Sequence, residues 1–540
     1  MKTKFIFIVG GVMSGVGKGV TAASIGRILT NKGYSVSAVK IDPYINVDAG
    51  TMNPVEHGEV FVTQDGDETD QDIGNYERFL GKDILSSNYM TTGRVYLSVI
   101  EKERKLAYRG KCVEVVPHIP EEVILRIKTA VKDSGAEIMI VEIGGTVGEY
   151  QNILFLEAAR MMHLRAKKDV QFILVSYLPI PGNLGEMKTK PTQYAIRTLN
   201  SAGIQPDFVV CRAEKDLDIP RRHKLELFGN MASGSVISAP DVASIYDVPG
   251  VLEDQHMGNK LLRNFGIRPR KNNWTSWKKL THNIHNPGKP VRIAMVGKYF
   301  GSGDFVLPDA YISVIESVKH AAWSQNLKPE LAWIDSEKFE NGQAPKDILK
   351  DFDGVIVPGG FGKRGVEGKI KAIEYCRTHK VPYFGLCYGM QLAAVEFARH
   401  VLGHKKAHTT EIDPSTPDPL IYIIPNKIFE ETKKYGGTMR LGAYPCQIDK
   451  NSKAFEYYGS EMISERHRHR YEFNNDYKDA FNKKGFKTVG ICPDNGLVEI
   501  LELEGHPFFI GTQFHPEFKS RPLDPHPLFV GFVRAAATVN

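Results

Sequence analysis

One cysteine of this chain lies between two glycines, in the string Gly385-Leu-Cys387-Tyr-Gly389. A strand-like run at 381–384 precedes it and a helix-like run at 390–399 follows, so we expect Cys387 on a sharp strand-to-helix turn. Glycines suit the flanking positions because side chains there would collide in such a turn. The N-terminus of the following helix favours the thiolate form. The pattern therefore makes Cys387 a candidate nucleophile.

A histidine and a glutamate further along the chain can complete a catalytic site. The string His515-Pro-Glu517 follows an apolar, strand-like run at 507–510. His515 can take the thiol proton, and Glu517 can hold the imidazole in the required tautomer. A glycine-flanked cysteine alone is as typical of a buried structural residue, and it is the histidine–glutamate pair that favours catalysis. We predict a triad of Cys387, His515 and Glu517.

A glycine-rich loop near the N-terminus has the composition of a phosphate-binding site. The loop Gly10-Gly-Val-Met-Ser-Gly-Val-Gly-Lys18-Gly-Val-Thr21 follows a predicted strand and opens a predicted helix. It departs from the common pattern GxxxxGK[ST], because Val12 stands at the first glycine position and Gly19 replaces the Ser or Thr after Lys18. Five glycines around one lysine nevertheless favour phosphate binding over an ordinary turn.

The missing hydroxyl has a consequence for a metal ion that would accompany the phosphates. Magnesium must then rely on other hard oxygen donors, and carboxylates are the expected ones. Asp70 and Asp72 lie in an acidic loop, in which Asp65 and Asp67 fit solvated charges. Glu142 ends an apolar strand, at the edge where parallel sheets form ligand sites.

The bulk composition excludes several classes of protein. With 540 residues, 42% hydrophobic and 24% charged, the chain is long enough for two to four domains with ample cores. A net charge of +6 permits anionic small substrates and does not require nucleic acid. Six cysteines without CxxC spacing indicate neither a disulfide framework nor a zinc site. No signal peptide or membrane span is predicted, so we expect a cytoplasmic protein without a membrane partner.

Strand, loop and helix patterns divide the chain into two α/β halves. The first half has buried strand candidates, and from residue 291 a second α/β unit begins, after a basic, turn-rich linker. This alternation predicts two doubly wound parallel sheets covered on both faces. We expect the segment 405–425, with four prolines, to be a loop and not part of a sheet. The strands expected in the first half are 4–9, 35–41, 137–141 and 170–175, and those in the second half include 291–297 and 354–357.

The chain resembles the CTP synthase family along nearly its full length. The matching segments lie in order at 10–19, 40–48, 57–62, 142–148 and 185–193, of which Asp42-Pro-Tyr-Ile-Asn46 and Lys188-Thr-Lys-Pro-Thr-Gln193 are the most specific. The second half resembles class I glutamine amidotransferases through 358–362, 385–391 and 466–472. The resemblance implies a P-loop synthetase domain at 1–268, a linker at 269–289 and an amidotransferase domain at 290–540.

The resemblance also implies a reaction. ATP would phosphorylate O4 of UTP, and ammonia from glutamine would then displace phosphate to give CTP, ADP and glutamate. Magnesium would accompany ATP, and no organic cofactor is implied.

The site residues implied by the resemblance fall into five groups. For ATP they are Gly15, Val16, Gly17, Lys18, Gly19, Val20 and Asp72, and for the metal Asp72 and Glu142. For UTP or CTP they are Ser14, Glu149, Tyr150, Gln151, Lys188, Thr189, Lys190, Pro191, Thr192, Gln193 and Lys224. For glutamine they are Gly360, Tyr388, Gly389, Met390, Gln391, Glu411 and Arg470, with Gly360 and Tyr388 supplying oxyanion N–H groups. For an internal ammonia path they are Pro54, His57 and Val60.

Regulation and assembly are implied in the same way. The loop 361–368, with Arg364, is similar to the lid through which GTP activates the family, and 149–151 is similar to the site of feedback by CTP. The family forms homotetramers. Two departures stand out: Tyr388 replaces a smaller aliphatic residue, and Glu149-Tyr-Gln151 replaces Asp-Ile-Glu.

Other functions remain open on the residues alone. Another glutamine-using amidoligase fits the two motifs, but the string 188–193 favours a UTP site. A P-loop scaffold ATPase with an inactive glutaminase half is disfavoured by the complete triad. The basic run Arg466-His-Arg-His-Arg470 could be a nucleic-acid patch, but it lacks interleaved aromatic residues.

Overall fold

The computed structural model describes residues 2–53, 57–182, 185–298, 301–302, 305–306, 308–360, 362–423 and 439–538. By its internal contacts the chain divides into two compact units. Unit 1 consists of Met1–Ala49 and Asp72–Thr281, and unit 2 consists of Gly50–Gln71 and His282–Asn540.

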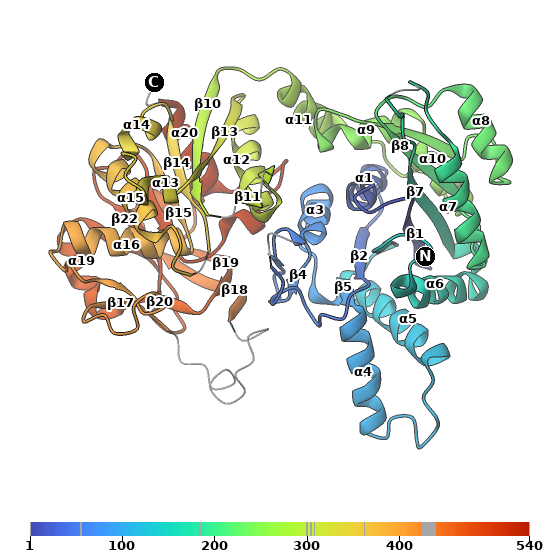
Figure 1. The fold of residues 1–540 in the computed structure, drawn as a ribbon, viewed down its shortest axis with the longest axis horizontal. Helices are drawn as coiled ribbons and strands as arrows, with labels where there is room; N and C mark the ends of the chain where they lie inside the picture. Colours follow the sequence, from blue (N-terminus) through green and yellow to red (C-terminus); the bar gives the residue numbers. More distant parts are fainter. Residues whose placement is uncertain are drawn as a thin grey trace. The chain divides into compact units, whose positions relative to one another are not determined.

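Unit 1 is built on a parallel sheet of seven strands in the order β5-β2-β6-β1-β7-β8-β9 (Figure 1). Every neighbouring pair in it is parallel, as the alternation of strands and helices predicts. The strands are β1 (Lys4–Gly11), β2 (Val36–Asp42), β5 (Tyr89–Thr91), β6 (Ile138–Ile143), β7 (Val170–Tyr177), β8 (Phe208–Ala213) and β9 (Val236–Pro240).

Helices of unit 1 cover both faces of this sheet because its strands are apolar on both sides. Phe7 and Val9 of β1 belong to a core with apolar residues of α5, α6 and α7, whereas Ile6 and Ile8, which point to the opposite face, are equally buried. The α-helices are α1 (Lys18–Asn31), α3 (Gln71–Leu80), α4 (Thr92–Arg104), α5 (Val115–Ser134), α6 (Ile153–Arg165), α7 (Lys190–Ser201), α8 (Ile219–Phe228), α9 (Val248–Asp254), α10 (Met257–Asn264) and α11 (Thr275–His285).

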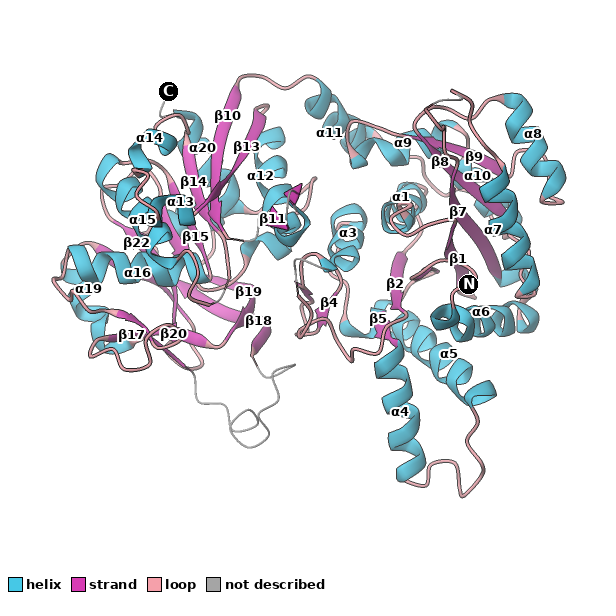
Figure 2. Cartoon of the chain, in the orientation of Figure 1, coloured by secondary structure: helices cyan, strands magenta, loops and turns pink. Residues whose placement is uncertain are grey.

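Unit 2 contains a mixed sheet of nine strands in the order β13-β10-β14-β15-β23-β22-β21-β18-β19 (Figure 2). The first five are parallel, as predicted, and the last four extend the sheet with antiparallel pairs. The strands are β10 (Pro290–Gly297), β13 (Lys328–Asp335), β14 (Gly354–Val357), β15 (Tyr383–Leu386), β18 (Arg440–Ile448), β19 (Met462–His469), β21 (Phe486–Ile491), β22 (Val498–Leu503) and β23 (Phe509–Thr512).

Two apolar cores lie on the faces of this sheet, one with α15 and α16 and the other with α12 and α20. The helices of unit 2 are α12 (Ile312–Ser324), α13 (Glu337–Glu340), α14 (Pro345–Leu349), α15 (Val366–His379), α16 (Tyr388–His400), α18 (Lys453–Tyr458), α19 (Lys478–Lys483) and α20 (Pro527–Thr538).

One sequence expectation about an irregular segment differs from the structure. The expectation of a loop at 405–425 is wrong, because β16 (His408–Thr409) and β17 (Pro419–Ile423) form a small sheet with β20 (Tyr471–Phe473). Leu420 and Ile421 are fully buried there, an apolar pair that the surrounding prolines obscure. The expected linker contains α11, whose Trp277 and Leu280 are buried.

A short segment of the first half groups with unit 2. In Gly50–Gln71, strands β3 (Phe61–Val62) and β4 (Glu68–Thr69) form a hairpin that packs on β19. The Arg466 guanidinium donates to the Val62 carbonyl over 3.0 Å, and Arg468 donates to Glu68 over 2.9 Å. These contacts explain why the segment belongs to unit 2 and not to unit 1.

Among the described residues, no helix combines the length and apolar character needed to cross a membrane. The six cysteines are all free thiols, and only Cys112 is exposed.

Candidate active sites

The turn that the sequence predicts around the cysteine is present in unit 2. Cys387 separates β15 from α16 and has φ 48° and ψ −98°, a conformation that L residues rarely adopt. A Cβ at position 385 would lie 2.7 Å from the Gly389 backbone, and one at 389 would lie 2.1 Å from the Val357 carbonyl oxygen. Both glycines are therefore required by close backbone packing.

The histidine and glutamate are held close to this turn. His515 Nδ1 lies 2.7 Å from Glu517 Oε1, and the imidazole stacks on Phe518. Although burial alone would lower it, the pKa of His515 is raised to about 10 by the Glu517 carboxylate and the Cys387 sulfur. His515 is therefore fitted to carry a proton beside the Cys387 sulfur.

A cavity of about 460 Å³ opens onto the cysteine. Of the glutamine-binding residues expected from the sequence, Gly360, Tyr388, Gln391, Glu411 and Arg470 line it. Gly389 and Met390 are not among the described lining residues, since Met390 is fully buried and packs against Gly511. The lining also includes Gly50, Glu59, Val60, Ala310, Tyr311, Gly359, Met439, Arg468, His469, Tyr471 and Phe518.

The cavity lining carries a carboxyl suited to an amino acid, and a buried lysine lies near the Tyr388 ring. Glu411 Oε1 accepts a hydrogen bond from the Gly362 N–H over 2.6 Å, and burial raises the pKa of this carboxyl. The Lys369 ammonium lies 5.3 Å from the centroid of the Tyr388 ring, and burial lowers the pKa of Lys369 to about 7. The large Tyr388 side chain is 2% exposed, and it also lines the cavity.

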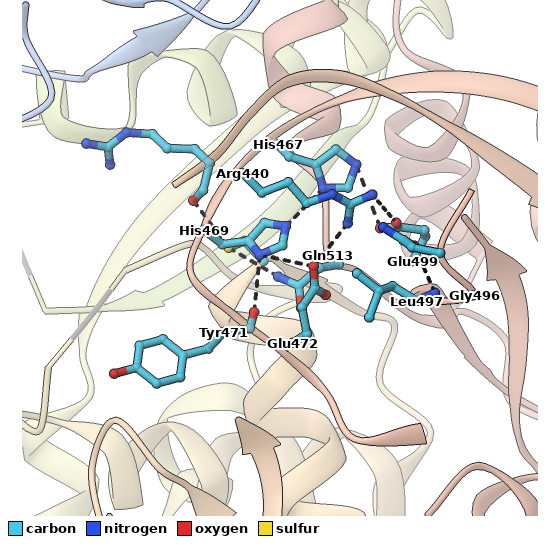
Figure 3. Close-up of polar contacts among 12 residues, drawn as sticks. Arg440, His467, His469, Tyr471, Glu472, Gly496, Leu497, Glu499 and Gln513 are labelled. Atoms are coloured by element: carbon cyan, nitrogen blue, oxygen red, sulfur yellow. Dashed lines mark hydrogen bonds and ion pairs between the residues drawn. The ribbon is translucent and has the colours of Figure 1, made fainter. Parts of the chain in front are cut away.

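A buried polar network joins strands of the nine-stranded sheet to β20 of the small sheet (Figure 3), and its His469 also lines the cavity. Arg440 donates to Glu472 over 3.0 Å and to Glu499 over 2.8 Å. His467 Nδ1 lies 3.0 Å from His469 Nε2, and His469 Nδ1 lies 3.1 Å from the Tyr471 carbonyl oxygen.

The network contains two carboxyls but one guanidinium, and its buried environment favours the neutral forms of its other ionisable groups. Burial raises the pKa of Glu499 to about 7, and burial and the neighbouring Glu499 raise that of Glu472 well above its usual range. Burial lowers the pKa of both His467 and His469 well below the usual range. One guanidinium therefore faces two carboxyls near neutral pH, and one of these carboxyls is favoured in the protonated form.

In unit 1 the glycine loop has the backbone of a phosphate cradle. It joins β1 to α1, with positive φ values at Val12, Gly15 and Gly17, and α1 begins at Lys18. Lys18 Nζ donates to the Gly145 carbonyl oxygen over 2.9 Å, which holds the ammonium beside the loop. Burial lowers the pKa of Lys18.

The two carboxylates expected from the sequence converge beside this loop. Lys40 Nζ donates to Asp72 and lies 3.3 Å from Glu142, to which the Tyr76 hydroxyl also donates. Burial raises the pKa of Glu142, whereas Lys40 outweighs burial and lowers that of Asp72. A Cβ at Gly19 would lie 2.0 Å from Asp72 Oδ1. The Asp72 carboxylate thus fills the space that a Ser or Thr would need at that position.

The residues expected to bind the pyrimidine nucleotide lie on several elements of unit 1. Lys188 and Thr189 lead into α7, whose first turn contains Lys190–Gln193, and Lys224 is exposed on α8. The Thr192 hydroxyl bonds with Ser176 at the end of β7 over 2.8 Å. Gln151 donates to Glu149 over 2.9 Å in the turn that follows β6. Ser14 is exposed in the glycine loop.

Of the three residues expected on an ammonia path, the structure describes two. Val60 lines the cavity of unit 2, whereas His57 is exposed and is not among the described lining residues. Pro54 lies outside the described residues. Phe361 of the expected lid also lies outside them, and Arg364 pairs with Glu337.

Sequence reasoning missed several residues of these sites. Glu59 accepts hydrogen bonds from Ser313 at the start of α12 and lines the cavity. Lys40 joins the two expected metal ligands, and Gln513 contacts Cys387. The sequence could have indicated Gln513, because it stands two positions before His515.

Comparisons with known proteins identify similar chains for both halves. Residues 4–267 match the family model described as CTP synthase N-terminus, and residues 306–535 match glutamine amidotransferase class-I. The CTP synthase of Caldanaerobacter subterraneus subsp. tengcongensis is 48% identical, over 98% of this chain and 98% of its own. That of Symbiobacterium thermophilum is 48% identical, over 99% of this chain and 98% of its own.

A similar solved structure is the glutaminase domain of Trypanosoma brucei CTPS with bound acivicin. It is 36% identical, covers 46% of this chain and 94% of its own length, and gives a TM-score of 0.42.

The buried network predicts a pH dependence of stability. Because the pKa of Glu499 rises from 4.5 to about 7 on folding, its neutral form contributes stability that is fully present below pH 4.5. This contribution is lost as the pH rises through about 7. We expect Glu499→Gln to reduce the fall in unfolding free energy between pH 5 and pH 8 by on the order of 1 kcal/mol or more.

Urea denaturation at four pH values measures this effect. Glu504→Gln, a change at an exposed glutamate next to β22, is the matched control and should keep the wild-type slope. An unchanged slope in Glu499→Gln would show that Glu499 is ionised throughout.

Proposed function

This chain belongs to the CTP synthase family, and on that premise we propose how its own residues carry out the reaction. It aminates UTP to CTP at the expense of ATP, with ammonia released from glutamine. The observation that carries the proposal is the presence of two different sites in one chain: a Cys-His-Glu site in unit 2 and a phosphate cradle with converging carboxylates in unit 1.

Glutamine is hydrolysed at Cys387. The Cys387 sulfur attacks the side-chain amide carbon, and the oxygen of the tetrahedral intermediate accepts N–H bonds from Tyr388 and Gly360. His515 gives its proton to the departing nitrogen, so that ammonia leaves and a thioester forms. Water, deprotonated by His515, then cleaves the thioester to glutamate, which returns the Cys387 thiolate beside the protonated His515. Glu517 keeps the imidazole oriented, as its 2.7 Å contact with Nδ1 supports.

The amino-acid end of glutamine is held by opposite charges across the cavity. Glu411 takes the α-ammonium group and Arg470 takes the α-carboxylate, while Gln391 adds a polar contact. Their place in the cavity lining supports these roles. Gly389 and Met390, at the start of α16, complete the expected glutamine site by shaping the turn beneath it.

ATP is held by the loop of unit 1. The backbone N–H groups of 15–20 and the Lys18 ammonium bind its phosphates, in keeping with the positive-φ turns and the start of α1. Asp72 and Glu142 fit a magnesium ion, because both are oxygen donors that already converge on a cation, Lys40. The ion would spread the charge of the transferring phosphoryl group. No organic cofactor is proposed.

UTP and its product share a triphosphate, which suits the cations Lys188, Lys190 and Lys224. The rest of the pyrimidine nucleotide site consists of Ser14, Thr189, Pro191, Thr192 and Gln193. CTP acts as a feedback inhibitor whose base and sugar contact 149–151. The ATP phosphoryl group passes to O4 of UTP, and ammonia then displaces phosphate at C4.

Further properties complete the proposal. Pro54, His57 and Val60 line the ammonia path, and GTP activates glutamine hydrolysis through the loop 361–368. The enzyme is a homotetramer of the cytoplasm, where Cys387 stays reduced. Omission of each substrate in turn, with CTP formation followed by ultraviolet absorbance, tests the reaction. UTP-dependent ATP hydrolysis separates it from other amidoligases.

Cys387→Ala should abolish glutamine-dependent synthesis and leave ammonia-dependent synthesis largely intact, because the acceptor site lies in unit 1. Parallel assays with glutamine and with ammonium chloride measure both activities. Cys112→Ala, at the exposed cysteine, is the control and should keep both. Equal loss of both activities in folded Cys387→Ala would contradict the two-site assignment.

Lys18→Ala should remove both activities, since phosphoryl transfer is common to them. A charged clamp on the transferring phosphates is worth several kcal/mol, so CTP formation should fall by ~10³-fold or more. Lys167→Ala, at an exposed lysine outside the site, should behave as wild type. Retained ammonia-dependent synthesis in Lys18→Ala would refute the role of the loop.

Gln151→Glu should tighten inhibition by CTP about fivefold, because a charge-assisted hydrogen bond is worth roughly twice a neutral one. The change also releases the Glu149 carboxylate from its present donor. A CTP titration at fixed UTP measures the effect, and the Michaelis constant for UTP should change little. Unchanged or weaker inhibition would mean that position 151 does not face the inhibitor.

A further inference from the structure

A fully buried glutamine lies against the nucleophile of unit 2 and has no part in the mechanism described so far. Gln513 follows β23 and is 0% exposed. Its side-chain nitrogen, Nε2, lies 3.6 Å from Cys387 Sγ, within the range of an N–H···S hydrogen bond. Its main-chain N–H donates to the Glu499 carbonyl over 2.8 Å, which fixes the backbone at this position.

The neighbouring contacts determine which end of the Gln513 amide faces the sulfur. Gln391 Nε2 lies 2.9 Å from the Tyr471 carbonyl oxygen, which can only accept a hydrogen bond. Gln391 must therefore present its NH₂ group there, and the same nitrogen lies 3.1 Å from Gln513 Oε1. In the reverse orientation, two NH₂ groups would face each other and an oxygen would face the sulfur. Gln513 is thus set to direct its N–H toward Cys387.

The buried network of Figure 3 anchors the start of this chain of contacts. His469 Nδ1 donates to the same Tyr471 carbonyl oxygen over 3.1 Å, and its Nε2 accepts from His467. Arg440 of β18 holds Glu472 of β20, in the small sheet, and Glu499 of β22. All five side chains are buried, so the chain of contacts has little freedom to rearrange.

We propose that Gln513 is a further catalytic residue of the glutaminase step, whose Nε2–H donates to Cys387 Sγ and stabilises the thiolate. The inference rests on the proposed function in taking Cys387 as the nucleophile. Gln391 and His469 act through Gln513 and are positioning residues in this respect. The groups that face the sulfur are then His515, the N-terminus of α16 and Gln513, with the Arg468 carbonyl 4.0 Å away.

The donation has a direct chemical consequence. A hydrogen bond to the anionic sulfur favours the thiolate over the thiol, and it weakens when the sulfur forms the neutral thioester. When water cleaves the thioester, the N–H is in place to receive the charge of the departing thiolate. Gln513 thereby assists both the first attack and the return of the free enzyme.

Two substitutions distinguish hydrogen-bond donation by Gln513 to Cys387 from a role of Gln513 in packing alone. Gln513→Glu is isosteric, keeps an oxygen toward Gln391, and replaces the donor that faces Cys387 by a second oxygen. Gln513→Met keeps size and neutrality but removes the donor. Gln447→Met, at an exposed glutamine of β18, is the matched control.

The readout is the rate of Cys387 alkylation by iodoacetamide as a function of pH, followed by mass spectrometry of the modified peptides. The exposed Cys112 of unit 1 serves as an internal standard in the same sample. At pH 7 we expect Gln513→Met to alkylate Cys387 about tenfold more slowly relative to Cys112, and Gln513→Glu more slowly still. The pH profile of Cys387 should move to higher pH in both variants, and glutaminase kcat should fall in parallel.

A raised KM for glutamine with unchanged Cys387 alkylation in Gln513→Met would overturn the inference, since it would show a packing role only. Ammonia-dependent synthesis and circular dichroism check that each variant is folded, and Gln513→Met decides the question if Gln513→Glu does not fold. Failure of wild-type Cys387 to react, or survival of glutamine-dependent synthesis in Cys387→Ala, would instead refute the proposed function itself.

Discussion

The strained backbone at Cys387 is the constraint on which the glutaminase site depends. With φ 48° and ψ −98° the residue occupies a conformation that costs on the order of 1–3 kcal/mol. The glycines on either side allow the turn to pack closely, because a Cβ at 385 or 389 would clash with the Gly389 backbone or the Val357 carbonyl. The Cys387 N–H also donates to the Thr512 carbonyl over 2.7 Å, which ties the turn to β23. Strand and helix thus hold the sulfur at the floor of the cavity.

The antiparallel part of the same sheet carries a buried polar network whose contacts lead to this sulfur. Its strands carry the buried guanidinium of Arg440, the carboxyl of Glu499 and two histidines that burial keeps neutral, and Arg440 also holds Glu472 on β20 of the small sheet. Such a network is costly unless its members are paired, so it favours one arrangement of the strands. That arrangement fixes Tyr471 and Gln513, and through them the polar contacts of Cys387.

In unit 1, charged side chains also hold one another in place, at the carboxyl ends of the parallel strands. Lys18 and Lys40 lie among Asp72 and Glu142, so cations and carboxylates hold one another in place in a largely buried site. Gly19 is required because the Asp72 carboxylate occupies the space beside it. The glycine at position 19, where the usual phosphate loop has Ser or Thr, is therefore a consequence of the Asp72 carboxylate that packs against it.

The sequence by itself determined the features that depend on local backbone chemistry. The turn at Cys387, the glycine loop before Lys18 and the strands that precede them follow from glycine placement and apolar runs. It did not reveal the antiparallel extension of the second sheet or the small sheet at β16 and β17, because their pairing partners lie far apart along the chain. The tertiary structure alone decided that Lys40 joins Asp72 to Glu142 and that Gln513 faces the sulfur. Those contacts depend on which strands become neighbours and on how buried polar groups find partners, and no local pattern specifies either.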